Sequence, residues 1–194
     1  MIFVRDKGRM CNNILQYGHL YAWARANNRK TVSMRFAYKY QYFHICRTRW
    51  HNFFVYLLAK YAAKLKLIPT VTFDTPDEDL TEKENAMRRG CLVAEGWFAR
   101  WYDLFLQYKS EILSLFAFDS HIENKVTSLL ETSSKEGIIR LGVHIRRGDY
   151  ATWNDGRFLY DDKQMINIIH QFILLHPNKR CLLYTSPSPR DVEE

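Results

Sequence analysis

The sequence predicts an α/β fold built on parallel strands. A strand, a polar loop and a helix follow one another at 2–27, and the same order returns at 138–175. The segment 138–145 is a largely aliphatic run with the length of a buried parallel strand. The chain has 194 residues, 47% of them hydrophobic, with 8 glycines and 5 prolines, which is the composition of an ordinary globular protein. Collagen-like, low-complexity and globally disordered proteins are therefore excluded.

A βαβ unit opens the chain. The apolar run from Ile2 to Val4 predicts the first strand, and apolar residues recur at helical spacing from about residue 12 to 27. Asn12 is the expected N-cap of that helix, because its side-chain carbonyl can accept hydrogen bonds from the first turn. Asn27 is its expected end, and a second strand is expected at 31–36.

The segment 50–68 predicts an amphipathic helix. Its apolar residues form one stripe, at positions 53/54, 57/58, 61/62 and 65. Lys60 and Lys64 lie on another side of the helix. Two interpretations remain open: the stripe covers a sheet, or the basic helix lies on an anionic lipid surface.

The rest of the chain divides at a polar stretch. Before it we expect a strand at 70–73, an acidic connection at 74–89, a strand at 91–94, and helices at 97–118 and 122–130. The predicted boundary is 131–137. After it we expect a strand at 138–145, a helix at 161–175 and a strand at 181–184. A second βαβ unit therefore starts at residue 138.

Charge is unevenly distributed along the chain. The formal net charge is +7, but residues 1–73 hold 13 basic residues and one acid, whereas 74–95 hold 7 acids and 3 bases. The basic surface therefore belongs to the N-terminal third. Its aromatic residues, interleaved with Lys and Arg, leave open an alternative class, a polyanion- or nucleic-acid-binding protein without catalysis.

Cysteine and histidine positions give no indication of a metal. The four cysteines form no CxxC pair, and the seven histidines lack metal-ligand spacing, so each is expected to be packed or at the surface. The first loop matches neither a dinucleotide-binding nor a Walker-type motif. The start MIFVRDKGR is charged where a secretion signal is apolar, and no uncharged apolar run reaches the ~18 residues of a membrane span. We expect a reducing, cytoplasmic location.

The segment His144-Ile-Arg-Arg-Gly-Asp-Tyr150 is the most informative motif. It follows a predicted parallel strand, and ligands of open α/β sheets bind beyond the carboxyl ends of strands. Arg146 and Arg147 are suited to an anion, because each guanidinium donates two parallel charge-assisted hydrogen bonds to a phosphate. Two solvated arginines beside a turn are the structural alternative. A phosphate-ester enzyme with His144 as nucleophile needs a second acid or histidine that the sequence does not identify.

This motif resembles the His-x-Arg-Arg-x-Asp donor motif of the fucosyltransferase superfamily, above all the bacterial α-1,2-fucosyltransferases. Two other segments agree in order and spacing. Residues 8–17 (GRMCNNILQY) are similar to the family's opening glycine loop and helix, and residues 95–102, with Glu111 and Ile112, are similar to its Gly-Tyr-Phe-Gln-Ser segment. Cys11, Asn13 and Ala99 depart from the family pattern, which is typical of a divergent branch.

The resemblance implies a glycosyltransferase B-type fold with two Rossmann-like domains. The N-terminal domain would be on the acceptor side, with Gly8, Arg9 and Asn12 in the matching loop. The C-terminal domain would hold GDP-fucose through His144, Arg146, Arg147 and Asp149. The implied reaction is inverting, metal-independent transfer of fucose to an acceptor glycan, with no cofactor and with Arg146 and Arg147 stabilising the departing diphosphate. The general base is not assigned, and Asp6 and Glu95 are interpreted as surface or cap carboxylates.

The end of the chain departs from a complete enzyme of this type. Only 57 residues follow Gly137, and a Rossmann-like domain needs about 120. The expected domains are 1–137, complete, and 138–181, the start of the GDP-fucose domain. Residues 182–194, with the string Ser-Pro-Ser-Pro-Arg, are expected to be a non-native tail. We therefore expect the chain to be an inactive fragment. Peripheral contact of the basic helix 50–66 with an anionic inner membrane is a hypothesis that stays open beside its structural interpretation.

Overall fold

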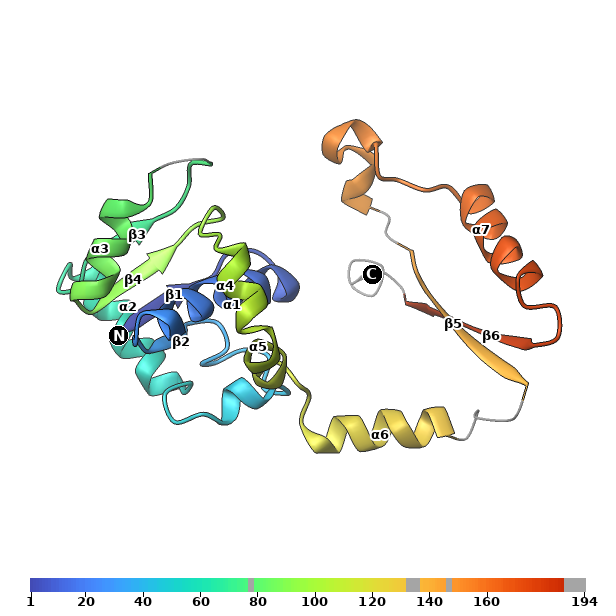
Figure 1. Ribbon diagram of the computed structural model, residues 1–194, viewed down its shortest axis with the longest axis horizontal. Helices are drawn as coiled ribbons and strands as arrows, with labels where there is room; N and C mark the ends of the chain where they lie inside the picture. Colours follow the sequence, from blue (N-terminus) through green and yellow to red (C-terminus); the bar gives the residue numbers. More distant parts are fainter. Residues whose placement is uncertain (77–78, 132–136, 146–147, 187–194) are drawn as a thin grey trace. The chain divides into compact units, whose positions relative to one another are not determined.

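The chain forms two compact units. The computed structural model describes residues 1–76, 79–131, 137–145 and 148–186. The first unit is Met1–Asn124 and the second is Lys125–Glu194. Figure 1 shows a four-stranded sheet with its helices in the first unit, and a two-stranded sheet beside one long helix in the second. Each unit is described by itself below.

The first unit is built on a parallel sheet. Its strands are β1 (Ile2–Arg5), β2 (Thr31–Ser33), β3 (Thr70–Thr72) and β4 (Leu92–Glu95). They lie in the order β2-β1-β4-β3, and each neighbouring pair is parallel. The α/β class predicted from the sequence is confirmed, and this topology is compatible with a Rossmann-like fold.

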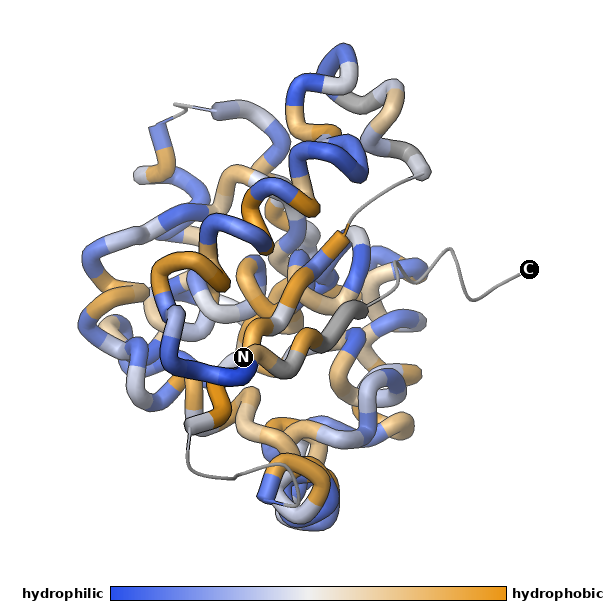
Figure 2. Tube along the Cα trace, turned by 90° about the vertical axis from the view of Figure 1, so that its right-hand side faces the viewer, coloured by the Kyte–Doolittle hydropathy of each residue, from blue (hydrophilic) through white to orange (hydrophobic). Residues whose placement is uncertain are grey.

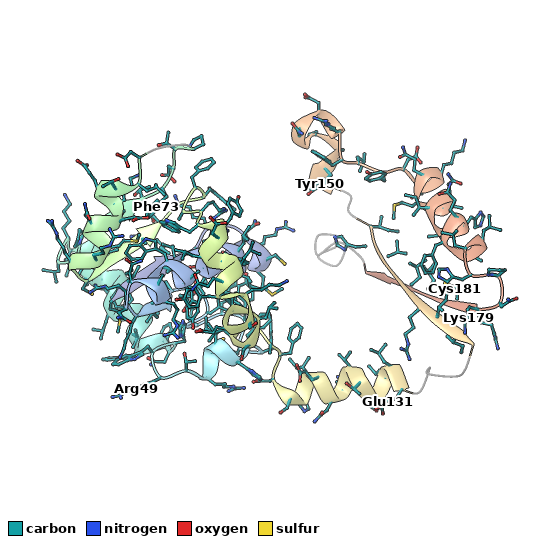
Figure 3. The ribbon with its side chains drawn as sticks, viewed as in Figure 1. Arg49, Phe73, Glu131, Tyr150, Lys179 and Cys181 are labelled. Carbon is teal, nitrogen blue, oxygen red and sulfur yellow. The ribbon has the colours of Figure 1, made fainter. Side chains whose placement is uncertain are left out.

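Helices cover both faces of this sheet. On one face α1 (Met10–Ala26) packs Tyr17, Leu20 and Trp23 against Ile2 and Val4. The same core contains Phe73 and residues of later helices, and Figure 3 shows Phe73 inside a dense cluster of side chains. On the other face α2 (Phe53–Lys64) lies over Phe3, Met34 and Val93. The sheet is thus the middle layer of three.

The opening βαβ unit is confirmed, with two differences in detail. Arg9, in extended conformation, is the N-cap of α1, so the prediction of Asn12 as N-cap is wrong and Asn12 lies in the first helical turn. The second strand ends at Ser33 rather than at residue 36. The reason is local, because the Ser33 hydroxyl accepts a hydrogen bond from the backbone N–H of Phe36 (3.2 Å) and turns the chain.

Helix α2 covers the sheet through small residues and leaves its predicted apolar stripe in solvent. Asn52 caps it by accepting a hydrogen bond from the Val55 N–H (3.0 Å). Ala59 is its buried residue, and Tyr56 and Ala63 pack beside it. The large residues of the predicted stripe are exposed instead: Phe53, Phe54, Leu58, Tyr61 and Leu65. The helix was predicted correctly, but the idea that this stripe covers the sheet is wrong.

Two predicted boundaries in the middle of the chain are also wrong. The acidic connection 74–89 contains α3 (Thr81–Arg89), in which Glu84 pairs with Arg88 (3.0 Å) and Met87 is buried. The expected helix 97–118 is two helices, α4 (Tyr102–Gln107) and α5 (Lys109–Leu115). Helix α4 starts later than residue 97 because two N–H groups before it have partners outside the helix. The Phe98 N–H donates to Phe73 O (3.0 Å), and the Trp101 N–H donates to His19 Nδ1 (3.1 Å).

The second unit is a parallel βαβ arrangement, as the sequence predicts. Its elements are β5 (Ile138–His144), the 3₁₀ turns η2 (Gly148–Ala151) and η3 (Trp153–Gly156), α7 (Asp162–Leu174) and β6 (Arg180–Ser186). A capping box formed by Asp161 and Gln164 starts α7. Strand β6 pairs with β5 through Ser186, so the backbone of 182–186 belongs to the sheet, and residues 187–194 lie outside the described residues.

The described part of the second unit has no fully buried side chain. Its helix α7 and the preceding α6 (Ser120–Glu131) bury no residue. Figure 2 shows hydrophobic and hydrophilic residues alternating along the helices of the chain, and Figure 3 labels Cys181, which lies on β6. Hydrophobic residues such as Ile166, Ile168 and Leu183 are about half exposed. The fold of this unit is therefore set by backbone pairing more than by a closed core.

The described residues settle two smaller points. All four cysteines are free thiols. No helix in 1–76, 79–131, 137–145 or 148–186 is long and apolar enough to cross a membrane. A short 3₁₀ turn, η1 (His44–Arg47), completes the list of helical elements.

Candidate functional site

The loops that follow β1 and β4 meet at the carboxyl edge of the first sheet. These two strands are neighbours although about 90 residues separate them in sequence, and the last residues of the two strands, Arg5 and Glu95, are paired in register. The two side chains form an ion pair (Arg5 Nε to Glu95 Oε2, 3.2 Å), with Glu95 largely buried. The interpretation of Glu95 as a simple surface or cap carboxylate is therefore wrong.

The first loop is held by Gly8 and Gln16. Gly8 has φ +85°, and a Cβ there would lie 2.9 Å from the Asn12 side-chain nitrogen and 3.1 Å from the Trp97 ring. The buried Gln16 side chain accepts from the Lys7 N–H (3.1 Å) and donates to Lys7 O (2.7 Å). The loop thus packs against Trp97 from the loop after β4.

The structure brings together two of the three acceptor residues that the sequence predicts. Gly8 and Asn12 lie together against Trp97. Arg9, between them, is exposed and carries no side-chain cap hydrogen bond to α1. Gln16 belongs to the segment 8–17 that resembles the family's opening loop and helix. The sequence did not indicate that its side chain fixes the loop through two hydrogen bonds to Lys7.

Asp6 is a buried carboxyl group next to this loop. Its Oδ2 accepts a hydrogen bond from Ser33 Oγ (2.8 Å), whereas its Oδ1 is buried with no hydrogen-bond partner among the described residues. Burial raises the pKa of Asp6 to about 7, and the Ser33 hydrogen bond and the charge of Arg35 oppose this rise only in part. The interpretation of Asp6 as a surface or cap carboxylate is wrong, because the residue is almost fully buried.

The raised pKa of Asp6 predicts a pH dependence of stability. A carboxyl group that holds its proton more tightly in the folded state stabilises that state at low pH, and this contribution is lost as pH rises through 7. We expect the free energy of unfolding of the wild type, minus that of Asp6→Asn, to fall by about 2 kcal/mol between pH 5 and pH 7.

Urea unfolding of both proteins at several pH values measures this difference. Burial lowers the pKa of His19 and of His51 to about 4, so these residues make both proteins more stable as pH rises from 4 to 6.5. Because both variants contain them, their contribution cancels in the difference. A stability difference between wild type and Asp6→Asn that stays constant from pH 5 to pH 7 would contradict the raised pKa of Asp6.

The buried histidines have structural partners. His51 Nε2 accepts from the Ser33 N–H (2.9 Å), and its Nδ1 lies 2.6 Å from Thr48 Oγ1. His19 Nδ1 accepts from the Trp101 N–H (3.1 Å). For these two residues the expectation of packed histidines is confirmed. The described residues contain no group of three or more His, Cys, Asp or Glu side chains placed to hold a metal ion.

The predicted donor motif begins at the carboxyl end of β5. His144 is the last residue of that strand, and it is exposed. Arg146 and Arg147 lie outside the described residues. Gly148 has φ +69° and starts η2, and Asp149 follows it in the same turn. Glycine adopts the positive φ of Gly148 without the steric cost that a Cβ would bring.

Comparison with known proteins adds no relative. No protein-family model, curated protein or solved structure matches the chain.

Proposed function

We propose that the protein is a glycosyltransferase that transfers fucose from GDP-fucose to a hydroxyl group of an acceptor glycan. The proposed fold is of glycosyltransferase B type, with acceptor residues Gly8, Arg9 and Asn12 in the first unit. The proposed donor residues are His144, Arg146, Arg147 and Asp149 in the second. The proposed linkage is α-1,2, with inversion at the sugar and no metal or other cofactor.

One observation supports this most strongly. The motif His-Ile-Arg-Arg-Gly-Asp begins at the last residue of β5, a strand that pairs in parallel with β6 through the intervening α7. The carboxyl end of such a strand is where α/β proteins bind anionic ligands. The positive φ of Gly148 lets the backbone turn immediately after the two arginines. The arrangement of Gly8 and Asn12 at the carboxyl edge of the first sheet is a second, independent support.

The chemistry follows from charge. As the bond between fucose and the β-phosphate breaks, negative charge grows on the phosphate oxygens. Arginine donors aimed at those oxygens stabilise the transition state more than the ground state, which lowers the barrier. Arg146 and Arg147 would provide this positive charge, and His144 and Asp149 would orient the donor at the strand end.

Calorimetric titration of the chain with GDP-fucose, GDP and guanosine tests the proposal. We expect GDP-fucose and GDP to bind with similar, weak affinity that falls as salt is added, and guanosine not to bind, because the phosphates supply the interaction. No binding of GDP at low ionic strength would contradict the donor site. Tight, guanine-selective binding together with fucose transfer would contradict the expectation that the phosphates alone supply the interaction.

The alternative of a nucleic-acid or polyanion surface has less support. It needs exposed aromatic rings between the basic residues of 25–66. Phe36 and Phe43 from this region are buried in the core, and Phe36 packs edge-on against Phe116 at 5.0 Å. Arg49, labelled in Figure 3, does lie over the ring of Trp50, with 5.0 Å to its centroid. Other rings of this region are exposed, among them Phe54 and Tyr61 on α2, and Lys60 lies 6.0 Å from the centroid of the Tyr61 ring. The alternative therefore keeps part of its support.

We also propose that α2 lies on an anionic membrane surface. Its exposed stripe of Phe54, Leu58, Tyr61 and Leu65 has the spacing of one helix face, and Leu58 and Leu65 are 56% and 67% exposed. Lys60, Lys64 and Lys66 lie beside it, so apolar insertion and attraction to anionic lipid would act together. Such contact would suit an acceptor that is a lipid-linked or surface-polysaccharide precursor.

Co-sedimentation with vesicles tests this contact. Leu58→Ser with Leu65→Ser should weaken binding to anionic vesicles by about tenfold, because two large apolar groups no longer enter the lipid. Leu106→Ser with Leu113→Ser removes two equally exposed leucines elsewhere on the first unit and should leave binding unchanged. Equal partitioning with neutral and anionic vesicles, or none with either, would leave α2 a purely structural element.

A further inference from the structure

A basic pocket lies between α2 and the sheet of the first unit. Its cavity is about 580 Å³. Charged and aromatic residues line it: Arg5, Arg35, Tyr38, Tyr56, Lys60, Lys64 and Glu95. Arg5 and Glu95 are the last residues of β1 and β4, and Arg35 comes shortly after β2. The pocket therefore reaches the same carboxyl edge as the Gly8 loop.

The positive charge of this pocket is only partly neutralised. Arg5 is paired with Glu95. Arg35 Nη1 donates to the Tyr38 hydroxyl (2.8 Å), and Lys60 lies over the ring of Tyr56 (5.7 Å to its centroid). Among the described residues, no carboxylate lies within ion-pair distance of Arg35, Lys60 or Lys64. Arg35 also lies near Asp6, whose backbone carbonyl accepts from Arg35 Nε (3.4 Å) and whose carboxyl group feels the charge of Arg35. Arg35, Lys60 and Lys64 thus bring three positive charges to one cavity without an ion pair to the residues that the structure describes, which favours an anion site.

The remaining lining favours a sugar attached to the anion. The rings of Tyr38 and Tyr56 lie 4.4 Å apart between centroids, inclined by 36°, and offer apolar surface and a hydroxyl group beside the cations. A cavity of about 580 Å³ lies within the range of small-ligand pockets. Lys60 and Lys64 are exposed, so a ligand can reach them from solvent.

We infer that this pocket binds the anionic group of an acidic acceptor saccharide, either a phosphate ester or a uronic-acid carboxylate. The identity of the ligand as an acceptor rests on the proposed function, whereas the anion chemistry rests on Arg35, Lys60 and Lys64 alone. The pocket would hold the charged part of the acceptor on the α2 side and leave the Gly8 loop free for the hydroxyl that reacts.

Titration of the chain with glucose 1-phosphate, glucuronate and glucose tests the inference directly. We expect either anion to bind at least tenfold more tightly than glucose at low salt, and the tighter of the two identifies the anion. Lys60→Ala with Lys64→Ala should weaken this binding at least tenfold. Lys30→Ala with Lys109→Ala removes the same charge at exposed positions outside the pocket and should change it less than twofold.

Two results would overturn the pocket assignment: equal losses in the two double variants, or glucose binding as tightly as both anions. GDP titrated into the Lys60→Ala, Lys64→Ala protein separates this inference from the proposed function. Its affinity should be unchanged, because the diphosphate site is proposed at Arg146 and Arg147. Loss of saccharide binding with retained GDP binding therefore supports the pocket, and absence of GDP binding contradicts only the donor site.

Discussion

Gly96→Ala is expected to destabilise the first unit by about 4 kcal/mol, as the sum of backbone strain and overpacking. Gly96 follows β4 and has φ +119°, a conformation that residues with a Cβ rarely adopt. An added Cβ would lie 2.5 Å from the carbonyl carbon and 2.7 Å from the amide nitrogen of Phe73. A loss of this size removes a large share of the stability of a typical domain.

The backbone of Phe73 cannot yield to relieve this clash. Its N–H donates to Glu95 O (2.7 Å), and its carbonyl accepts from the Phe98 N–H (3.0 Å). Its side chain is fully buried in the main core. Moving the strand away would therefore break backbone hydrogen bonds and open the core together.

Gly90→Ala is the matched control for this measurement. Gly90 ends α3 with φ −131°, and a Cβ there would meet nothing within 4 Å. We expect it to be neutral or stabilising by up to about 1 kcal/mol, because alanine has less conformational freedom in the unfolded chain. Urea unfolding followed by tryptophan fluorescence measures both variants. Similar stabilities for the two would contradict the close packing of Gly96 on Phe73.

Regular hydrophobic patterns were sufficient to predict most strands and helices of both units. Strands β1, β4 and β5 and helices α1, α6 and α7 lie within a few residues of the expected segments. Helix α3 escaped because its signals are polar. Asp79 accepts from the Thr81 N–H (2.9 Å), Glu84 pairs with Arg88, and Met87 is the only buried residue of the helix. A hydrophobicity pattern has little to detect in such a helix.

The buried face of α2 shows a different reason for error. Hydrophobicity gives most weight to large residues, and for this reason one of the two interpretations left open was that the stripe with Phe54 and Leu58 covers the sheet. The sheet is in fact approached by Ala59 and Ala63, which allow the helix backbone to come close to Val93. Sequence periodicity identified the helix, but the choice between its two faces depends on the shape of the sheet, which local sequence does not contain.

In the first unit, the sequence could predict only those contacts of the candidate site that join residues close together in the chain. Gly8 and Asn12 are four residues apart, and their proximity follows from one loop and one helical turn. The burial of Asp6 depends on Ser33, which is 27 residues away, and the pocket charge depends on Arg35 and α2. Such long-range pairings arise from parallel strand order, so they were not readable from the sequence.

Under the proposed function, Arg146→Ala or Arg147→Ala is expected to raise the barrier for fucosyl transfer by about 2–4 kcal/mol, the scale of one lost transition-state donor. In the chain described here the same changes should weaken GDP binding about tenfold or more, because each removes a charge-assisted pair of hydrogen bonds to phosphate. The free energy of unfolding should not change, because the proposed role of both arginines is in ligand binding.

Two further variants, Arg146→Lys and Arg157→Ala, serve as controls for this test. Arg146→Lys keeps the charge but not the planar two-donor geometry, so it should rescue little of the lost affinity or rate. Arg157→Ala removes the same charge from an exposed position of the same unit, where the guanidinium lies over the Phe158 ring, and should leave GDP binding within about twofold of wild type, the effect of a screened surface charge. Calorimetry with GDP and a fucose-transfer assay provide the measurements. Unchanged GDP affinity and turnover in both alanine variants would remove these arginines from the proposed site.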